Sequence, residues 1–318
     1  MLKEIWNKIV QYDKVIIHRH ISPDPDALGS QIGLATLIRH RYPEKWVKVV
    51  GFNESSLSWM GEMDQVFDEE YEGALVLIMD TANGARIDDY RYGTGSFTIK
   101  FDHHPNVDEY ADLNYTNTMA AATCEMVVHL FDANQVDHQL EMPKEAAELL
   151  YAGIIADSGR FLYDSTTVST LESAKRLYET QFNRNRVHHL LYKRTLNVVQ
   201  AEGYVLNHFE TTDEGVAYYK MSKNQQEKFK LTTGTRSALV STLANIEGIR
   251  VWVSFFENED GQIRANIRSN GPIINQVAAE YNGGGHPQAS GAMLPSWEAC
   301  EPLVEALSQV CREYEPTQ

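Results

Sequence analysis

The chain has 318 residues, of which 43% are hydrophobic and 23% are charged, and its formal net charge at pH 7 is −16. This composition is typical of a globular protein with a packed core and excludes a disordered or collagen-like chain. The acidic balance argues against binding to long double-stranded nucleic acid, because neutralising its phosphates requires a surface rich in lysine and arginine.

Three cysteines, widely spaced and odd in number, can form neither a disulfide framework nor a paired-cysteine metal site. The N-terminal segment 1–17 carries charges through its first half and lacks a small-residue cleavage site, so we expect no secretory signal. No apolar run approaches the roughly 20 residues that a membrane helix needs. We therefore expect a cytoplasmic protein that does not associate with a membrane.

In the first half of the chain, short apolar runs alternate with helical patterns. The runs are rich in β-branched or aromatic residues, as buried strands are. They lie at 14–18, 47–53, 74–80 and 97–102. Apolar residues at helical spacing predict a helix at 26–42, and further helices are predicted between about 119 and 207, including 144–157 and 172–180. This alternation predicts an α/β domain with a mostly parallel sheet covered by helices.

The pattern changes in the second half. Residues 183–210 are predicted to form one long polar-faced helix that connects two domains. The segments beyond it predict a smaller α+β domain: strands at 215–222, 250–258 and 262–270, a glycine cluster at 282–291 and a helix at about 296–313. We accordingly expect a first domain over 1–188, a helical connector over 189–208 and a second domain over 209–318.

Carboxylate and imidazole side chains follow the predicted strands of the first domain. Three groups stand at strand ends and one residue at a helix end: His20, Asp24 and Asp26 after 14–18; Asp80 at the end of 74–80; Asp102, His103 and His104 around the end of 97–102; and Asp157 at the end of 144–157. In open α/β sheets the ligand crevice lies beyond the carboxyl ends of the strands. These side chains are therefore expected to project into one crevice.

Carboxylates and imidazoles without a thiolate suit Mn²⁺ or Mg²⁺ better than structural zinc. Two such ions about 3.5–4 Å apart can generate a hydroxide and hold both the attacking and the leaving oxygen of a phosphate ester. Each group alone has an ordinary explanation, such as a turn and helix cap for Asp24 and Asp26. Together, at successive strand ends, they favour a two-metal centre.

Six segments resemble the motifs of the DHH phosphoesterase superfamily and its DHHA1 substrate-binding domain, in family order. They are HISPDPDALGS (20–30), VLIMDTAN (76–83), FDHHP (101–105), GIIADSGRF (153–161), RSNG (268–271) and GGGHPQASG (283–291). The resemblance spans about 14 to 310 and is strongest to the branch of nano-RNases and pAp phosphatases. It implies an active site in the cleft between the two domains.

The resemblance also implies a role for each residue. Six residues would hold two Mn²⁺ ions, with Mg²⁺ as the alternative: His20 and Asp24 one ion, Asp26, His103 and Asp157 the other, and Asp80 both. Asp102 would orient His103 by accepting its free ring N–H. His104 would face the substrate phosphate and stabilise charge or donate a proton. Substrate binding is implied for Arg268, Ser269, Gly284, Gly285 and His286, with Arg264 a further candidate on the alternating face of Arg268.

The implied function is hydrolysis of RNA of about two to five nucleotides, a size that fits a small cleft, and of pAp. The products would be 5′-mononucleotides and AMP. One alternative is a pApA or cyclic-di-AMP phosphodiesterase in second-messenger turnover. A non-catalytic nucleotide-binding module would lack at least one metal ligand, and an inorganic pyrophosphatase would not need the RSNG and GGGH segments. A homodimer is compatible with the sequence.

Overall fold

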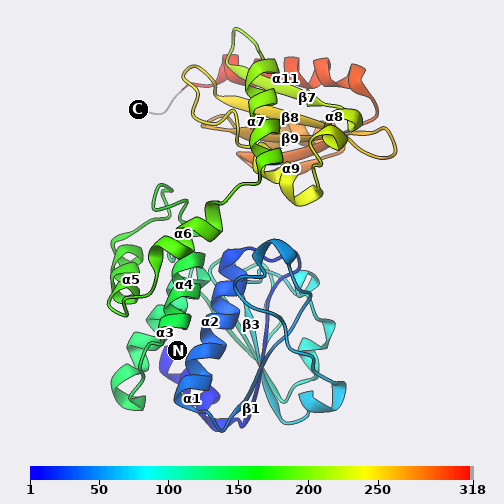
Figure 1. The fold of residues 1–318 in the computed structure, drawn as a ribbon. Helices are drawn as coiled ribbons and strands as arrows, with labels where there is room; N and C mark the ends of the chain where they lie inside the picture. Colours follow the sequence, from blue (N-terminus) through cyan, green and yellow to red (C-terminus); the bar gives the residue numbers. More distant parts are fainter. Residues whose placement is uncertain (316–318) are drawn as a thin grey trace. The chain divides into compact units, whose positions relative to one another are not determined.

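The computed structural model describes residues 1–315 and divides the chain into two compact units, Met1–Lys193 and Arg194–Gln318. Each unit has its own sheet (Figure 1) and its own hydrophobic core. The break falls inside the segment 189–208 that is expected to connect two domains. Among residues 1–315, no helix combines the length and the apolar character needed to cross a membrane.

The first unit is built on a five-stranded sheet in the order β2-β1-β3-β4-β5, in which every neighbouring pair is parallel. Its strands are β1 (Lys14–His18), β2 (Trp46–Val49), β3 (Ala74–Met79), β4 (Phe97–Asp102) and β5 (Leu113–Thr116). All six residues of β3 are buried, as expected where both faces of a sheet are covered. The predicted parallel α/β domain is confirmed, while the half-buried β5 was not predicted from the sequence.

Helices cover one face of this sheet. They are α1 (Leu2–Gln11), α2 (Pro25–Arg41), α3 (Thr123–His138) and α4 (Lys144–Asp157), while α5 (Val168–Tyr178) packs on α3 and α4 and α6 (Arg184–Tyr192) packs on α4. The other face carries a smaller apolar cluster that includes Val50, Val66 and Tyr71. The chain on that side contains the 3-10 turns η2 (Asp68–Tyr71), η3 (Gly84–Arg86) and η4 (Tyr90–Thr94). The turn η1 (Ser55–Leu57) belongs to the helix side, where Leu57 packs against the larger core.

Two glycines allow the central helices to pack closely. A Cβ atom at Gly153 of α4 would lie 2.3 Å from Cys124 Sγ and 2.8 Å from Asp26 Oδ1. A Cβ atom at Gly29 of α2 would lie 2.6 Å from the Leu149 carbonyl oxygen. Because such distances are far below van der Waals contact, the close packing of α2, α3 and α4 requires glycine at both positions.

The second unit contains a six-stranded mixed sheet in the order β10-β11-β9-β8-β7-β6. The strands are β6 (Glu210–Thr211), β7 (Val216–Met221), β8 (Val251–Glu257), β9 (Ile263–Ser269), β10 (Gly284–His286) and β11 (Ala289–Leu294). The smaller α+β domain is thus confirmed. The glycine cluster at 282–291 forms β10 and the start of β11, and these two strands together with β6 add three to the three predicted.

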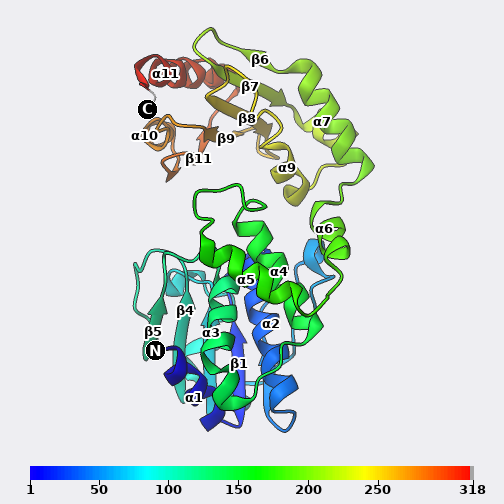
Figure 2. The same cartoon turned by 90° about the vertical axis from the view of Figure 1, so that its left-hand side faces the viewer.

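Helices lie on both faces of this second sheet (Figure 2). On one face are α7 (Leu196–His208) and α9 (Thr233–Leu239); on the other are α10 (Asn275–Glu280) and α11 (Cys300–Glu313), which follows the 3-10 turn η5 (Trp297–Ala299). The short helix α8 (Lys223–Lys228) follows β7.

The single long helix predicted over 183–210 is wrong. The chain forms two helices, α6 and α7, with residues 193–195 outside both. Val198, Ala201 and Val205 of α7 are buried in one cluster with Ala217 and Tyr219 of β7. This packing makes α7 part of the second unit rather than a solvated connector.

Candidate metal centre

The first cluster of acidic residues is built by the start of α2. Asp24 caps this helix, because its Oδ1 accepts hydrogen bonds from the backbone N–H groups of Asp26 and Ala27. Its Oδ2 lies 3.8 Å from the Nε2 atom of His20. Asp26, in the first turn of the same helix, is fully buried. The cap thus places three side chains at the carboxyl end of β1.

Asp80 occupies the middle of the cluster. It follows β3 with a left-handed backbone (φ +52°), and its N–H donates to the Phe101 carbonyl oxygen of β4. Its Oδ2 lies 3.4 Å from His20 Nε2, and its Oδ1 lies 3.5 Å from His103 Nε2. The buried Asp80 carboxylate therefore stands between the two imidazoles.

The structure brings together the six side chains predicted as ligands. Their ligand atoms form groups whose members all lie within 4.8 Å of one another: His20, Asp24 and Asp80; Asp26, His103 and Asp157; and Asp80, His103 and His104. Asp80 and His103 each belong to two groups. Asp80 is thus placed where one carboxylate could serve two ions.

The tautomers of His20 and His103 fit a metal. Nδ1 of His20 lies 2.8 Å from the Ile21 carbonyl oxygen, and Nδ1 of His103 lies 3.2 Å from the Ala120 carbonyl oxygen. Because a carbonyl only accepts, each neutral imidazole carries its proton on Nδ1. Both Nε2 lone pairs then face carboxyl oxygens, and the buried Nε2 of His103 has no hydrogen-bond partner. A divalent cation satisfies this arrangement.

The carboxylates of the cluster fit a cation as well. Burial raises the pKa of Asp26 to about 7, and the adjacent Asp80 adds to the effect. Burial, followed by repulsion from Asp26, raises the pKa of Asp157 to about 10. Carboxylates in this position are stabilised in their charged form when a divalent ion binds between them. All donors are oxygen or imidazole nitrogen, which suits Mn²⁺ or Mg²⁺.

The N-terminus of α3 supports two members of the cluster. The N–H groups of Thr123 and Cys124 donate to the two oxygens of Asp26 at 2.7 and 2.8 Å. The Thr123 hydroxyl group donates to Asp80 Oδ1 at 3.0 Å. The sequence predicts that Thr123 and Glu125 open a helix packed near the site, but nothing in it shows which carboxylates lie beside that helix end.

The expectation that Asp102 orients His103 is wrong. Oδ1 of Asp102 lies 2.9 Å from Nδ1 of His104, and His103 is bonded to the Ala120 carbonyl oxygen instead. This hydrogen bond raises the pKa of His104 to about 9. The sequence analysis also missed Lys100, whose buried ammonium group lies 3.7 Å from Asp102 Oδ2. The sequence feature that could have identified it is a lysine inside the otherwise apolar strand segment FTIKFD (97–102).

In the second unit, four of the five predicted substrate-binding residues lie on one side of the sheet or at its edge. The side chain of Arg268 alternates on β9 with buried Ile267 and Ser269. Ser269 points to the opposite face, where its hydroxyl group donates to the Pro272 carbonyl oxygen. The structure therefore does not bring the Ser269 hydroxyl to the face of Arg268, because successive residues of a strand face opposite ways.

His286, Gly284 and Gly285 form β10, the edge strand next to β11. A Cβ atom at Gly285 would lie 2.6 Å from the Ala289 carbonyl oxygen, so the hairpin itself requires glycine there. Gly284 instead faces open space.

The β9–β11 region has a second arginine. The guanidinium group of Arg264 lies over Gly291, where a Cβ atom would come within 2.7 Å of Nη2. Burial lowers the pKa of Arg268, and the charge of Arg264 adds to the effect. In the described part of the chain, neither arginine forms an ion pair with a carboxylate. We call Arg264, Arg268 and His286 the cationic face.

Comparison with known proteins agrees with these two units. The chain matches the family models "DHH family, N-terminal domain" over residues 14–154 and "DHHA1 domain" over residues 213–313. The bifunctional oligoribonuclease and PAP phosphatase NrnA of Bacillus subtilis is 45% identical over 315 residues, which cover 99% of this chain and 100% of that protein. A protein of Streptococcus mutans, named as the probable counterpart, is 43% identical over 98% of this chain and 99% of its own length.

An exopolyphosphatase-related protein of Bacteroides fragilis has the same fold, with a TM-score of 0.85 and 23% identity over 98% of this chain and 97% of that one. The resemblance identified from the motifs is thereby confirmed. The chain belongs to the DHH family and carries a DHHA1 domain after its DHH domain.

Proposed function

We propose that this protein is a two-metal phosphohydrolase that degrades very short RNA to 5′-mononucleotides and converts pAp to AMP. The observation that carries the proposal is the pair of His20 and His103 Nε2 lone pairs facing carboxylates around Asp80. The names of the relatives from Bacillus subtilis and Streptococcus mutans support the substrate class.

The metal ligands of the proposal are those that the geometry brings together. His20, Asp24 and Asp80 would hold one ion, and Asp26, His103 and Asp157, with Asp80, would hold the other. We propose Mn²⁺ as the native metal, with Mg²⁺ as the alternative. Bound there, two divalent ions would supply a nucleophile from water and offset the negative charge of a phosphate group.

His104 is proposed to donate a proton to the leaving 3′ oxygen. Its Nδ1 is held by Asp102, which leaves Nε2 free to face a substrate, and 41% of its side chain is exposed. A pKa of about 9 keeps the imidazole protonated at neutral pH. One geometry then serves both substrates, because the bond that breaks joins phosphorus to a 3′ oxygen in pAp as well as in RNA.

The cationic face of the second unit is proposed to bind the part of the nucleotide that does not react. Arg264 and Arg268 offer planar guanidinium groups suited to a phosphate, and His286 is exposed beside them on the edge strand. A cytoplasmic location is proposed from the RNA substrate class and the three free thiols.

The proposal is tested by measuring Mn²⁺-dependent release of mononucleotide from four substrates side by side: pAp, a five-nucleotide RNA, pApA and cyclic-di-AMP. We expect comparable turnover of pAp and RNA by the wild-type protein and none by Asp80→Ala. Turnover confined to the two dinucleotides would replace the proposal with second-messenger hydrolysis. No turnover of any substrate would support a non-catalytic module.

A further inference from the structure

We propose that Glu125 is a positioning residue for the metal centre: it fixes the turn before α3, and that turn fixes Asp26, Asp80 and His103. This inference rests on the metal-binding function proposed above. Glu125 itself forms no contact with the six proposed ligands in the hydrogen bonds and ion pairs of the described residues. Its effect is therefore transmitted through the backbone of residues 120–124.

Glu125 is a buried carboxylate whose oxygens are fully engaged. Its side chain is 1% exposed. Oε2 accepts hydrogen bonds from the Ala121 N–H at 3.0 Å and from the Thr170 hydroxyl group at 2.8 Å. Oε1 accepts one from the Ser169 hydroxyl group at 2.9 Å. Such bonds to an ionised acceptor are strong and directional, so the Ala121 N–H is held firmly in place.

The turn held in this way contacts three members of the metal centre. The Ala120 carbonyl oxygen, which belongs to the same planar peptide group as the Ala121 N–H, accepts the Nδ1 proton of His103 at 3.2 Å. The Thr123 and Cys124 N–H groups bind Asp26, and the Thr123 hydroxyl group binds Asp80. A shift of Ala121 would therefore rotate the His103 imidazole and move the donors of two carboxylates together.

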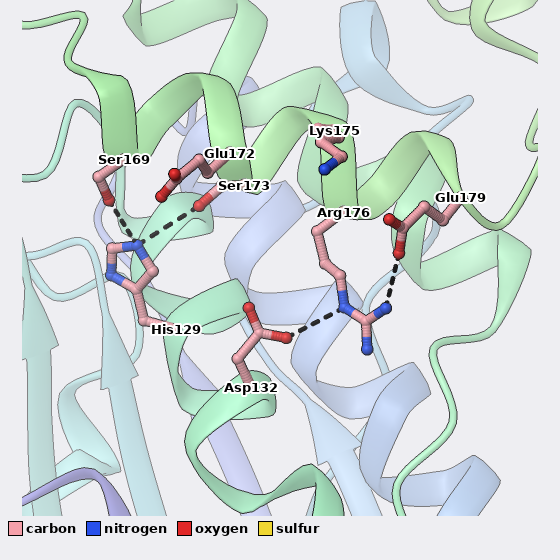
Figure 3. Close-up of a pocket in the computed structure, with 8 residues that line it drawn as sticks. All are labelled: His129, Asp132, Ser169, Glu172, Ser173, Lys175, Arg176 and Glu179. Atoms are coloured by element: carbon pink, nitrogen blue, oxygen red, sulfur yellow. Dashed lines mark hydrogen bonds and ion pairs between the residues drawn. The ribbon is translucent and has the colours of Figure 1, made fainter.

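One of the hydroxyl groups that bind Glu125, that of Ser169, is itself oriented by His129. Figure 3 shows the ring of His129, on α3, pointing at Ser169 and Ser173 of α5. Because Ser169 gives its proton to Glu125, His129 Nε2 must donate to Ser169, at 2.9 Å. These residues border a pocket of about 280 Å³ between α3 and α5. The chain of bonds runs from His129 through Ser169 and Glu125 to Ala121.

A carboxylate that only joined α3 to α5 would affect stability and leave metal affinity unchanged. A positioning residue affects the affinity for metal in the folded protein, since ligand geometry is set by the groups behind the ligands. The two roles are separated by titrating the 318-residue chain with Mn²⁺ alone and following free Mn²⁺ by electron paramagnetic resonance, with circular dichroism as the check on folding.

Three variants are compared with the wild type. In Glu125→Ala the Ala121 N–H loses its acceptor, and we expect Mn²⁺ affinity to fall by about 10- to 100-fold. Glu125→Gln keeps an amide oxygen for the Ala121 N–H and the Thr170 hydroxyl group, so it should retain most of the affinity. The matched control is Glu172→Ala, which removes an exposed carboxylate from the pocket that His129 and Ser169 border and should bind Mn²⁺ as the wild type does.

Wild-type affinity in folded Glu125→Ala would overturn the inference, as would an equal loss in Glu125→Gln and Glu125→Ala. If Glu125→Ala does not fold, Thr170→Val removes one donor from Oε2 and should weaken Mn²⁺ binding in the same direction, whereas unchanged binding would overturn the inference. Failure of the wild-type chain to bind Mn²⁺ would instead overturn the proposed metal centre, and this inference with it.

Discussion

Asp102 binds the imidazole of His104 and not that of His103, although the two rings are 4.4 Å apart between centroids. A carboxylate thus holds one imidazole, while the backbone carbonyl of Ala120 holds the other. The first arrangement keeps a ring protonated, and the second leaves a lone pair free for a metal. Neighbouring histidines of one motif are therefore suited to different tasks.

This difference predicts opposite outcomes for two alanine variants. His104→Ala should lower kcat by about 10²- to 10⁴-fold, because it removes a proton donor, while Mn²⁺ affinity stays close to that of the wild type. His103→Ala should lose Mn²⁺ binding. Steady-state kinetics on pAp and Mn²⁺ titration of both variants check this, and a loss of Mn²⁺ binding in His104→Ala would show that His104 is itself a ligand.

Asp80 is predicted to be indispensable for the reaction and dispensable for the fold. Asp80→Ala removes the carboxylate that is proposed to serve both ions and should abolish hydrolysis. The fold should survive, because Asp80 contributes a crowded buried charge rather than apolar packing. Circular dichroism and the pAp assay provide the measurement. Retained Mn²⁺-dependent turnover in this variant would contradict the bridging role.

The stabilisation of the protein by Mn²⁺ should grow with pH. Burial raises the pKa of Asp26 from 3.8 to about 7 and that of Asp157 to about 10. A carboxyl group whose pKa is higher in the folded than in the unfolded chain contributes its full stabilisation at a pH below its unfolded-state pKa of 3.8. This stabilisation is lost as the pH rises through the folded-state pKa. Mn²⁺ replaces the protons, so its effect is largest where the carboxyl groups would ionise.

The measurement is the difference in Tm between samples with Mn²⁺ and samples with a chelator. We expect this difference to be larger at about pH 8.5 than at about pH 5.5. Asp80→Ala, which should bind Mn²⁺ poorly, serves as the control and should show little difference at either pH. A Tm difference independent of pH in the wild type would indicate that protons and metal do not compete for the cluster.

The cationic face should distinguish substrates by the phosphate that does not react. Arg264→Gln is expected to raise KM for pAp by about tenfold, the effect of losing one charge-assisted hydrogen bond, with kcat little changed. KM for adenosine 3′-phosphate, which lacks the 5′-phosphate, should not change. Lys228→Gln removes an equal charge from the exposed end of α8 and serves as the control. Equal effects on both substrates would contradict a contact with the 5′-phosphate.

The sequence predicted those parts of the molecule that local pattern determines. β1, β3 and β4 are continuous apolar runs, and the residues that end or follow them meet because parallel strands share one carboxyl edge. β5 has only four half-buried residues and β10 only three exposed ones, so neither has a periodic signal. The break between α6 and α7 was missed because both helices continue the same helical spacing.

The partners of the site residues were harder to predict than the residues themselves. Asp102 precedes both histidines, and only the backbone path after β4 decides which ring it reaches. Thr123 and Glu125 lie on α3, which is far in the sequence from Asp26 and Asp80. The contacts that α3 makes with these carboxylates therefore follow from helix packing rather than from a sequence motif. Cys124, in contrast, is a buried thiol, and burial raises its pKa.

Gly153 is required both for the packing of the core and for the position of a proposed metal ligand. Because a methyl group there would press on Cys124 and on the Asp26 carboxylate, Gly153→Ala should cost about 1–3 kcal/mol through overpacking. The same displacement would disturb a proposed ligand. Both packing and metal binding therefore disfavour a larger residue at position 153. In a relative that has lost its catalytic activity, only the packing constraint remains, so we expect larger residues at this position to occur first in such inactive relatives.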